Sequence, residues 1–178
     1  MRQPIFDLTK AQPPIIGELA FPKAHFRIPQ EEKTVYLTFD DGPVPVYTPQ
    51  VIKILQEYNV PATFFMVGEN VFKFPDMYKA VKEAGHAVGS HTYNHLRGWD
   101  TNNATYIENV RKGAEIVQSN LFRPPYGKIK PSQARVLNKE LHIIMWDIIT
   151  MDYDHNLTGE DCFQSVKDYV RNGSIIVF

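Results

Sequence analysis

The stretch Val35-Tyr-Leu-Thr-Phe-Asp-Asp-Gly-Pro43 is an apolar run that ends in two neighbouring carboxylates. Its β-branched and aromatic residues favour a strand over residues 34–39, and Gly42-Pro43 is typical of the turn that stops one. Asp40 and Asp41 are therefore expected at the carboxyl end of this strand. Two adjacent negative charges raise each other's pKa unless a cation or a hydrogen-bond donor lies close by. The pair is either a solvated Asp-Gly turn or part of a metal site, and the rest of the chain has to decide between them.

The composition is that of an ordinary globular protein. The chain has 178 residues, of which 43% are hydrophobic and 22% charged, and its net charge is −1. This length predicts one domain with a sizeable core, and the charge balance gives no reason to expect a nucleic-acid partner. The single Cys162 excludes an internal disulfide and a cysteine-based zinc site, so histidines and carboxylates are the ligands expected for any metal. Cys162 itself is expected to be a small buried hydrophobe near a helix start.

The sequence predicts no membrane span and little regular structure in its N-terminal part. No apolar run approaches membrane-spanning length, and residues 1–6 lack the apolar core and cleavage site of a secretory signal. We expect the chain as given to be cytoplasmic, with a removed leader as the alternative. Residues 1–33 contain five prolines and no sustained periodicity, so they predict an irregular arm packed on a domain that covers residues 34–178. The oligomeric state is left open.

From residue 34 onward, strand-like apolar runs alternate with segments of helical spacing. Strands are expected at 34–39, 62–67, 87–90, 121–123, 141–149 and 174–178, and helices at 48–58, 77–84, 106–117, 132–140 and 162–172. Such alternation implies right-handed crossovers and a mainly parallel sheet. In parallel sheets the active site forms beyond the carboxyl ends of the strands, whether the sheet is open or closed into a barrel.

Chemically suggestive residues follow several of these strands. They are Asp40-Asp41, Ser90-His-Thr-Tyr-Asn-His95, Arg123-Pro-Pro-Tyr-Gly127, and the stretch from Trp146 to Asp152-Tyr153. His91 and His95 are four residues apart, so one helical turn would bring both imidazoles to the same side, a spacing that clamps a metal ion. Two histidines and an aspartate with open positions suit a catalytic zinc or another borderline divalent ion. The remaining histidines are expected at the surface or hydrogen-bonded in the core: His25, His86, His142 and His155. For His155 a role in the site is kept as an alternative, because it is close to Asp152 in the sequence.

Three of these segments resemble the first three motifs of the polysaccharide deacetylases, the NodB-homology or carbohydrate esterase family 4 enzymes. They are Thr38-Phe-Asp-Asp-Gly42, Ser90–His95 and Arg123-Pro-Pro-Tyr126, in unbroken order. The resemblance covers residues 34–178 and implies an α/β fold, a distorted and incomplete (β/α) barrel. It also implies a metal-dependent hydrolase that removes acetyl groups from N-acetylated amino sugars of the chitooligosaccharide or peptidoglycan type, with a carbohydrate substrate as its partner.

The resemblance assigns a metal site and a base. Asp41, His91 and His95 would hold a divalent ion, with zinc expected first and cobalt or another divalent ion as the alternatives. Asp40 would be the general base. This division agrees with the physical expectation, because a ligating carboxylate is held in its ionised form while its neighbour stays free to take a proton.

The resemblance also assigns supporting roles. Arg123 would pair with the base and orient it, and the backbone N–H of Tyr126 would help to stabilise the oxyanion. Asp152 matches the fourth motif, in which an acid tunes a catalytic histidine, and Tyr153 stands where that motif usually has Trp. For Trp146 a place in the core and a place in the pocket wall are equally compatible with the sequence.

The family's fifth motif places a histidine, the catalytic acid, just after the last apolar strand, whereas this sequence ends at Phe178. We expect either a cut chain or a molecule without its acid, and we favour a cut because Ile175–Phe178 is unusually apolar for a natural terminus. Loss of a general acid removes roughly 10²–10⁴-fold in rate, so the chain is expected to be poorly active. Two other functions stay open: a catalytically silent carbohydrate-binding protein that keeps the metal site, and an amidohydrolase acting on a small non-sugar amide.

Overall fold

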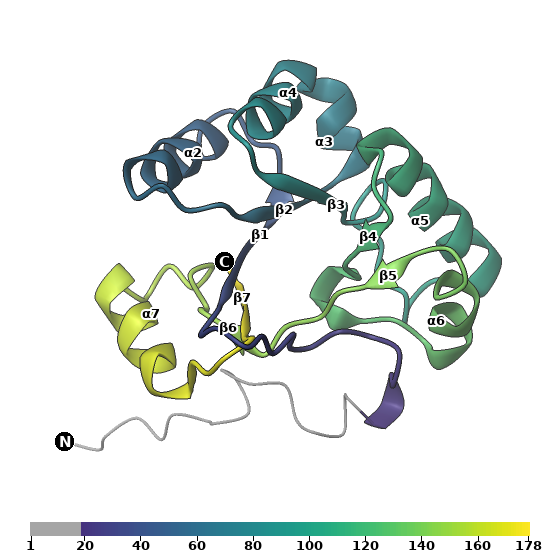
Figure 1. Cartoon of the computed structure of the whole chain (residues 1–178). Helices are drawn as coiled ribbons and strands as arrows, with labels where there is room; N and C mark the ends of the chain where they lie inside the picture. Colours follow the sequence, from purple (N-terminus) through teal and green to yellow (C-terminus); the bar gives the residue numbers. More distant parts are fainter. Residues whose placement is uncertain (1–18) are drawn as a thin grey trace.

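The computed structural model describes residues 19–178, so the first part of the predicted arm lies outside the described residues. Within them, seven parallel strands form one sheet in the order β5-β4-β3-β2-β1-β7-β6. The strands are β1 Tyr36–Gly42, β2 Thr63–Met66, β3 Ala87–Ser90, β4 Leu121–Phe122, β5 His142–Ile143, β6 Ile148–Ile149 and β7 Ile175–Val177. The sheet curls around the interior with the helices on its outer side (Figure 1). This architecture is the incomplete (β/α) barrel that the motifs implied.

Helices connect most of the strands. They are α2 Thr48–Glu57, α3 Gly68–Lys73, α4 Pro75–Glu83, α5 Asn103–Val117, α6 Pro131–Leu137 and α7 Gly159–Val166, with 3₁₀ turns η1 Pro125–Gly127 and η2 Lys167–Tyr169. Helix α3 was not predicted, because six residues are too few to display a helical period. Helix α7 begins earlier than predicted because Thr158 and Asp161 form a reciprocal capping box, in which each side chain accepts from the other's backbone N–H. None of the helices within residues 19–178 is long and apolar enough to cross a bilayer.

Alternation along β1 separates the two sides of the sheet. Leu37 and Phe39 pack in the cluster that contains the buried side chains of α2, on the outer side. Tyr36 packs with the inner cluster. Thr38 and Asp40 share the side of Tyr36, because residues two apart in a strand face the same way. The strand therefore carries an alcohol and a carboxylate into the interior of the barrel.

The apolar run 141–149 is not one strand, contrary to the prediction. It forms β5 and β6, which lie at opposite edges of the sheet, and residues 144–147 cross the open side of the barrel between them. Ile144 donates a backbone hydrogen bond to β4 at 2.8 Å, and Asp147 donates one to β7 at 2.9 Å. A crossing and a continuous strand have the same apolar pattern, so only the tertiary arrangement distinguishes them.

The described part of the predicted arm runs along this crossing segment. The backbone of His25 bridges to Ile144, and Phe26 is buried in a core cluster. Further along, Ile28 N–H donates to the carbonyl of Gly173 at 2.9 Å. These contacts place residues 25–28 over the side of the barrel that the sheet leaves open.

His86, between α4 and β3, departs from the expectation of a surface or satisfied histidine. It is only 7% exposed, its ring lies 5.4 Å from that of Phe64, and neither ring nitrogen has a hydrogen-bond partner among residues 19–178. Burial lowers the pKa of His86 because the charged ring would lose its hydration. His25, His142 and His155 are exposed, as expected.

We expect His86 to make the free energy of unfolding fall as the pH drops below about 6.5, the ordinary pKa of histidine. The folded protein keeps this ring neutral while the unfolded chain takes up a proton, so stability is full above that pH. Below it, stability is lost at up to about 1.4 kcal/mol per pH unit.

Urea unfolding of metal-free protein at about pH 7.5 and about pH 5.5 measures this loss. The variant His86→Phe should lose less stability than the wild type between the two pH values. The control His142→Gln, at an exposed position, should behave as the wild type. An unchanged pH dependence in His86→Phe would show that the proton uptake belongs to other groups.

Candidate metal centre

Asp41, His91 and His95 converge at the carboxyl edge of the sheet. Asp41 Oδ1 lies 3.5 Å from His91 Nε2 and 3.0 Å from His95 Nε2. One ligand atom from each residue lies within 4.8 Å of the others, and these three are the residues between 19 and 178 whose placement could hold a metal ion. The side chain of His91 is 3% exposed and that of Asp41 is 65% exposed. The cluster therefore has a buried side and a side open to solvent, as a catalytic metal site requires.

The protonation of this cluster suits a metal ion. His91 Nδ1 lies 2.8 Å from the carbonyl oxygen of Arg123; because a carbonyl only accepts, Nδ1 carries the proton and the Nε2 lone pair faces Asp41. Burial lowers the pKa of His91, which favours the neutral ring that binds metals. The hydrogen bond with His95 lowers the pKa of Asp41, which favours the ionised carboxylate. An anionic oxygen and a fixed imidazole lone pair are the donors that a divalent ion needs.

The two histidines are not brought together by a helical turn, so that expectation was wrong. Residues 91–95 form a turn in which Thr92 has φ 66° and His95 has φ 61°. The first N–H of α3 donates to the carbonyl of Thr92 at 3.0 Å, and Tyr93 N–H donates to Asn109 Oδ1 of α5 at 3.0 Å. Gly113 lets α5 approach this closely, since a Cβ there would lie 2.5 Å from the Thr92 backbone. Two helices thus hold the turn that carries both imidazoles.

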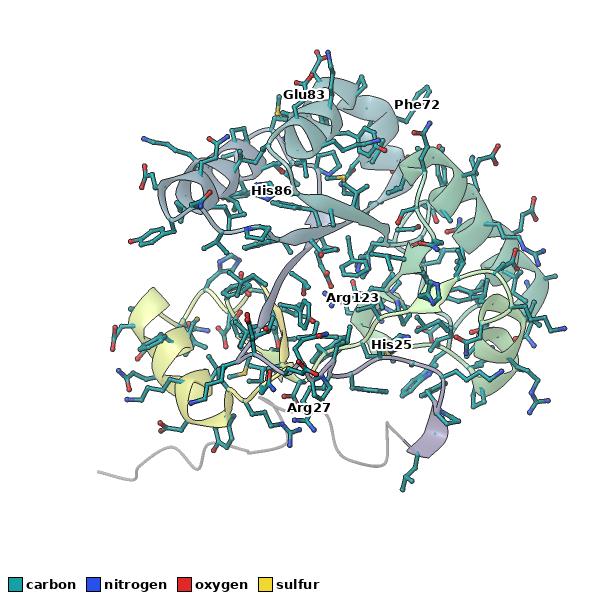
Figure 2. The ribbon with its side chains drawn as sticks, viewed as in Figure 1. His25, Arg27, Phe72, Glu83, His86 and Arg123 are labelled. Atoms are coloured by element: carbon teal, nitrogen blue, oxygen red, sulfur yellow. The ribbon has the colours of Figure 1, made fainter. Side chains whose placement is uncertain are left out.

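Asp40 lies beside the cluster and is paired with Arg123. Asp40 Oδ1 accepts from Arg123 Nη1 at 2.7 Å, while Oδ2 lies 4.0 Å from His91 Nε2. Arg123 is fully buried in the interior of the curled sheet (Figure 2). Its guanidinium lies 4.1 Å from the ring centroid of Phe65, and Nη2 donates to the carbonyl of Met145 at 3.0 Å. One oxygen of Asp40 is thereby held, and the other faces the metal cluster.

Tyr126 borders the cluster from the side of η1. Its hydroxyl lies 3.4 Å from His95 Nδ1, and its side chain is on the surface, with 54% of the residue exposed. The Arg97 guanidinium lies 4.6 Å from the Tyr126 ring centroid. Lys128 Nζ lies 5.6 Å from the ring of Trp99 and 6.0 Å from that of Tyr126. We call Arg97, Trp99, Tyr126 and Lys128 the aromatic rim. Tyr126 was predicted from its motif, whereas no motif pointed to the other three residues.

The fourth predicted segment does not join the cluster. Asp152 is exposed and accepts a hydrogen bond from Thr150 Oγ1 at 2.9 Å, and Tyr153 is 68% exposed. Trp146 is half-buried and packs against two core clusters. Its ring also lies against Gly127, where a Cβ would come within 2.8 Å of the indole. Trp146 therefore belongs to the core and also backs the loop that carries Tyr126.

The fold and the site together define a curled parallel (β/α) barrel with a His-His-Asp donor cluster at its carboxyl edge. The family model described as polysaccharide deacetylase matches residues 27–142. The chain belongs to this family.

Two curated relatives are similar to this chain over most of its length. It is 36% identical over 159 residues to a peptidoglycan-N-acetylglucosamine deacetylase of Bacillus cereus, a match that covers 85% of this chain and 58% of the relative. It is 33% identical over 159 residues to a chitooligosaccharide deacetylase of Azorhizobium caulinodans, with 85% and 75% covered. The chain thus spans less than two thirds of the Bacillus cereus protein.

A solved structure has the same fold. It is a crystal structure of a peptidoglycan N-acetylglucosamine deacetylase in complex with 4-naphthalen-1-yl-N-oxidanyl-benzamide, 33% identical to this chain. The two superpose with a TM-score of 0.83, over 87% of this chain and 75% of that one.

Proposed function

We propose that the protein is a metal-dependent deacetylase acting on N-acetylated amino sugars of the peptidoglycan or chitooligosaccharide type. Membership of the polysaccharide deacetylase family and the names of the two relatives support this class of substrate. The observation that carries the proposal is the convergence of Asp41, His91 and His95 beside Asp40, a carboxylate that is not itself in the donor cluster. A donor set with an open side and a neighbouring base suits hydrolysis by an activated water.

Asp41, His91 and His95 would hold the ion, with zinc as the first candidate and cobalt as another. When bound, the ion supplies Lewis acidity, which acidifies water and polarises an acetamide carbonyl. Asp40 takes the proton of the attacking water with the oxygen that faces the cluster. Arg123 orients that carboxylate, because its buried guanidinium holds the other oxygen, Oδ1, at 2.7 Å.

The developing negative charge and the leaving amine need two further groups. We assign the first to the backbone N–H of Tyr126, as the family pattern implies. The end of β7 borders the base, since Asp40 N–H donates to the carbonyl of Phe178 at 3.2 Å. The family pattern assigns the proton of the leaving amine to a histidine that comes just after this strand, and Asp152 keeps its proposed role of tuning that acid.

The aromatic rim favours a sugar polymer over a small non-sugar amide. Trp99 and Tyr126 are 58% and 54% exposed, and the ring of Tyr126 lies 4.9 Å from that of His95 in the metal cluster. Exposed aromatic faces provide apolar area for ring stacking, and the two cations beside them provide hydrogen-bond donors. A small acetamide would reach the cluster without needing this surface.

Metal analysis and acetate release test the proposal together. After equilibration with zinc and dialysis, the wild type should retain about one ion per chain, and His91→Ala should retain almost none. The control His142→Ala should bind as the wild type. Acetate release is then measured from acetylated chitooligosaccharides, from peptidoglycan and from a small acetamide, with and without zinc or cobalt.

The outcomes separate the alternatives. Undiminished metal content in both His91→Ala and Asp41→Ala would contradict the ligand assignment. One bound ion without acetate from any substrate would favour the catalytically silent protein. Release from the small acetamide alone would favour the amidohydrolase.

A further inference from the structure

Thr38, three residues before the metal ligand Asp41, has no role in the function proposed above. We infer that the Thr38 hydroxyl is a positioning group: it fixes the orientation of Arg123 and, through Arg123, that of Asp40. The inference rests on the proposed function, because it concerns the base of that reaction.

The Thr38 hydroxyl is held from two sides. The residue is 3% exposed and lies on the inner face of β1. Oγ1 donates to the carbonyl of Ile176 in β7 at 2.7 Å, and it accepts from Arg123 Nη1 at 2.7 Å. A hydroxyl has a single hydrogen; since the Ile176 carbonyl takes it, a lone pair is left facing the guanidinium.

This lone pair accepts one of the two hydrogens of Arg123 Nη1 and so determines how many are left for Asp40. Nη1 carries two hydrogens, and its two acceptors are Thr38 Oγ1 and Asp40 Oδ1, both at 2.7 Å. The other side of the guanidinium donates to the carbonyls of Ile144 at 3.3 Å and Met145 at 3.0 Å. Because the guanidinium is planar and rigid, acceptors on two sides leave it one orientation. In that orientation one Nη1 hydrogen remains for Asp40.

Without the Thr38 hydroxyl, the orientation of the Arg123 guanidinium would no longer be fixed on this side. Both Nη1 hydrogens would then be available to Asp40, and the fork could tilt toward β1. Asp40 Oδ2, now 4.0 Å from His91 Nε2, would lose its defined direction toward the cluster. A displacement of about 1 Å in a reacting group can cost about 100-fold in rate. Thr38 therefore acts on the reaction without touching the substrate.

Two substitutions at Thr38 and one control test the inference. Thr38→Val keeps the shape and removes the hydroxyl, whereas Thr38→Ser keeps the hydroxyl. Ser119→Ala is the matched control, because Ser119 Oγ also donates to a strand carbonyl, of Val88 at 2.7 Å, and accepts a backbone N–H, from Leu121 at 3.1 Å. Ser119 precedes β4 and so lies at the opposite end of the sheet from the metal cluster.

We expect Thr38→Val to lower kcat for acetate release by about 10- to 100-fold while KM stays within about twofold. Thr38→Ser should recover most of kcat. Ser119→Ala should lose stability in urea and keep the wild-type kcat. Wild-type kcat in Thr38→Val would overturn the inference, and so would an equal loss in Thr38→Val and Thr38→Ser.

A second measurement separates this inference from the proposed function. If the wild type releases no acetate, the proposed function fails, and the Thr38 role is read from a double-mutant cycle of unfolding free energies with Thr38→Val and Asp40→Ala, because alanine cannot accept from Arg123. Non-additive effects would show that Thr38 and Asp40, which act on each other through Arg123, are coupled. Additive effects would overturn the positioning role.

Discussion

Asp40→Asn should lower kcat for acetate release by roughly 10²- to 10⁴-fold, the usual contribution of a general base. Asparagine has the same shape as aspartate but cannot take a proton at neutral pH. Its side-chain oxygen can still accept from Arg123 Nη1, which now lies 2.7 Å from Asp40 Oδ1. The substitution therefore removes the base and leaves the neighbouring structure in place. Steady-state acetate release from an acetylated chitooligosaccharide measures the effect.

The metal content of the same variant distinguishes a base from a ligand. Asp40 is outside the donor cluster of Asp41, His91 and His95, so Asp40→Asn should still retain about one ion per chain. Asp76→Asn, at an exposed position in α4, serves as the control and should keep both activity and metal. If Asp40→Asn loses the ion, Asp40 is a ligand and the base must be sought elsewhere.

The convergence of Asp41, His91 and His95 could be predicted because it depends only on topology. Asp41 lies near the carboxyl end of β1, and His91 and His95 follow β3. Parallel strands present their carboxyl ends at one edge of a sheet. The order of strands and helices in the sequence was therefore enough to place them together. The local backbone was not predictable in this way: the left-handed conformations of Thr92 and His95 depend on contacts with α3 and α5.

The interior of the barrel could not be predicted from the residue types. Arginine is rarely buried fully, and Arg123 is buried only because its acceptors arrive from distant parts of the chain. One of them, Thr38, is held by the carbonyl of Ile176, 138 residues away in the sequence. The crossing at residues 144–147 supplies two more, and the apolar pattern gave no sign of it. Partners that far apart become visible only in the folded molecule.

Arg123→Met should lower the free energy of unfolding by about 3–5 kcal/mol, the usual cost of breaking a buried ion pair on one side. The variant leaves Asp40, whose side chain is only 16% exposed, without its cation. It also removes the donors to Ile144 and Met145 that tie the crossing segment to the interior. Urea unfolding of metal-free protein measures the loss. Arg111→Met, in an exposed pair with Glu140 at 2.7 Å, should change stability little.

A double variant shows how much of this loss is uncompensated charge. In Arg123→Met with Asp40→Asn no buried carboxylate is left alone, so the double variant should be more stable than Arg123→Met itself. Arg123→Lys keeps the charge but not the planar fork, and its stability should lie between those of Arg123→Met and the wild type. If Arg123→Met does not fold, the stabilities of Arg123→Lys and of the double variant still show which costs more, the unpaired carboxylate of Asp40 or the lost hydrogen bonds of the guanidinium. Wild-type stability in Arg123→Met would mean that the backbone bonds of the crossing segment to β4, β7 and His25 are enough to hold it, and that the buried cation serves only the base.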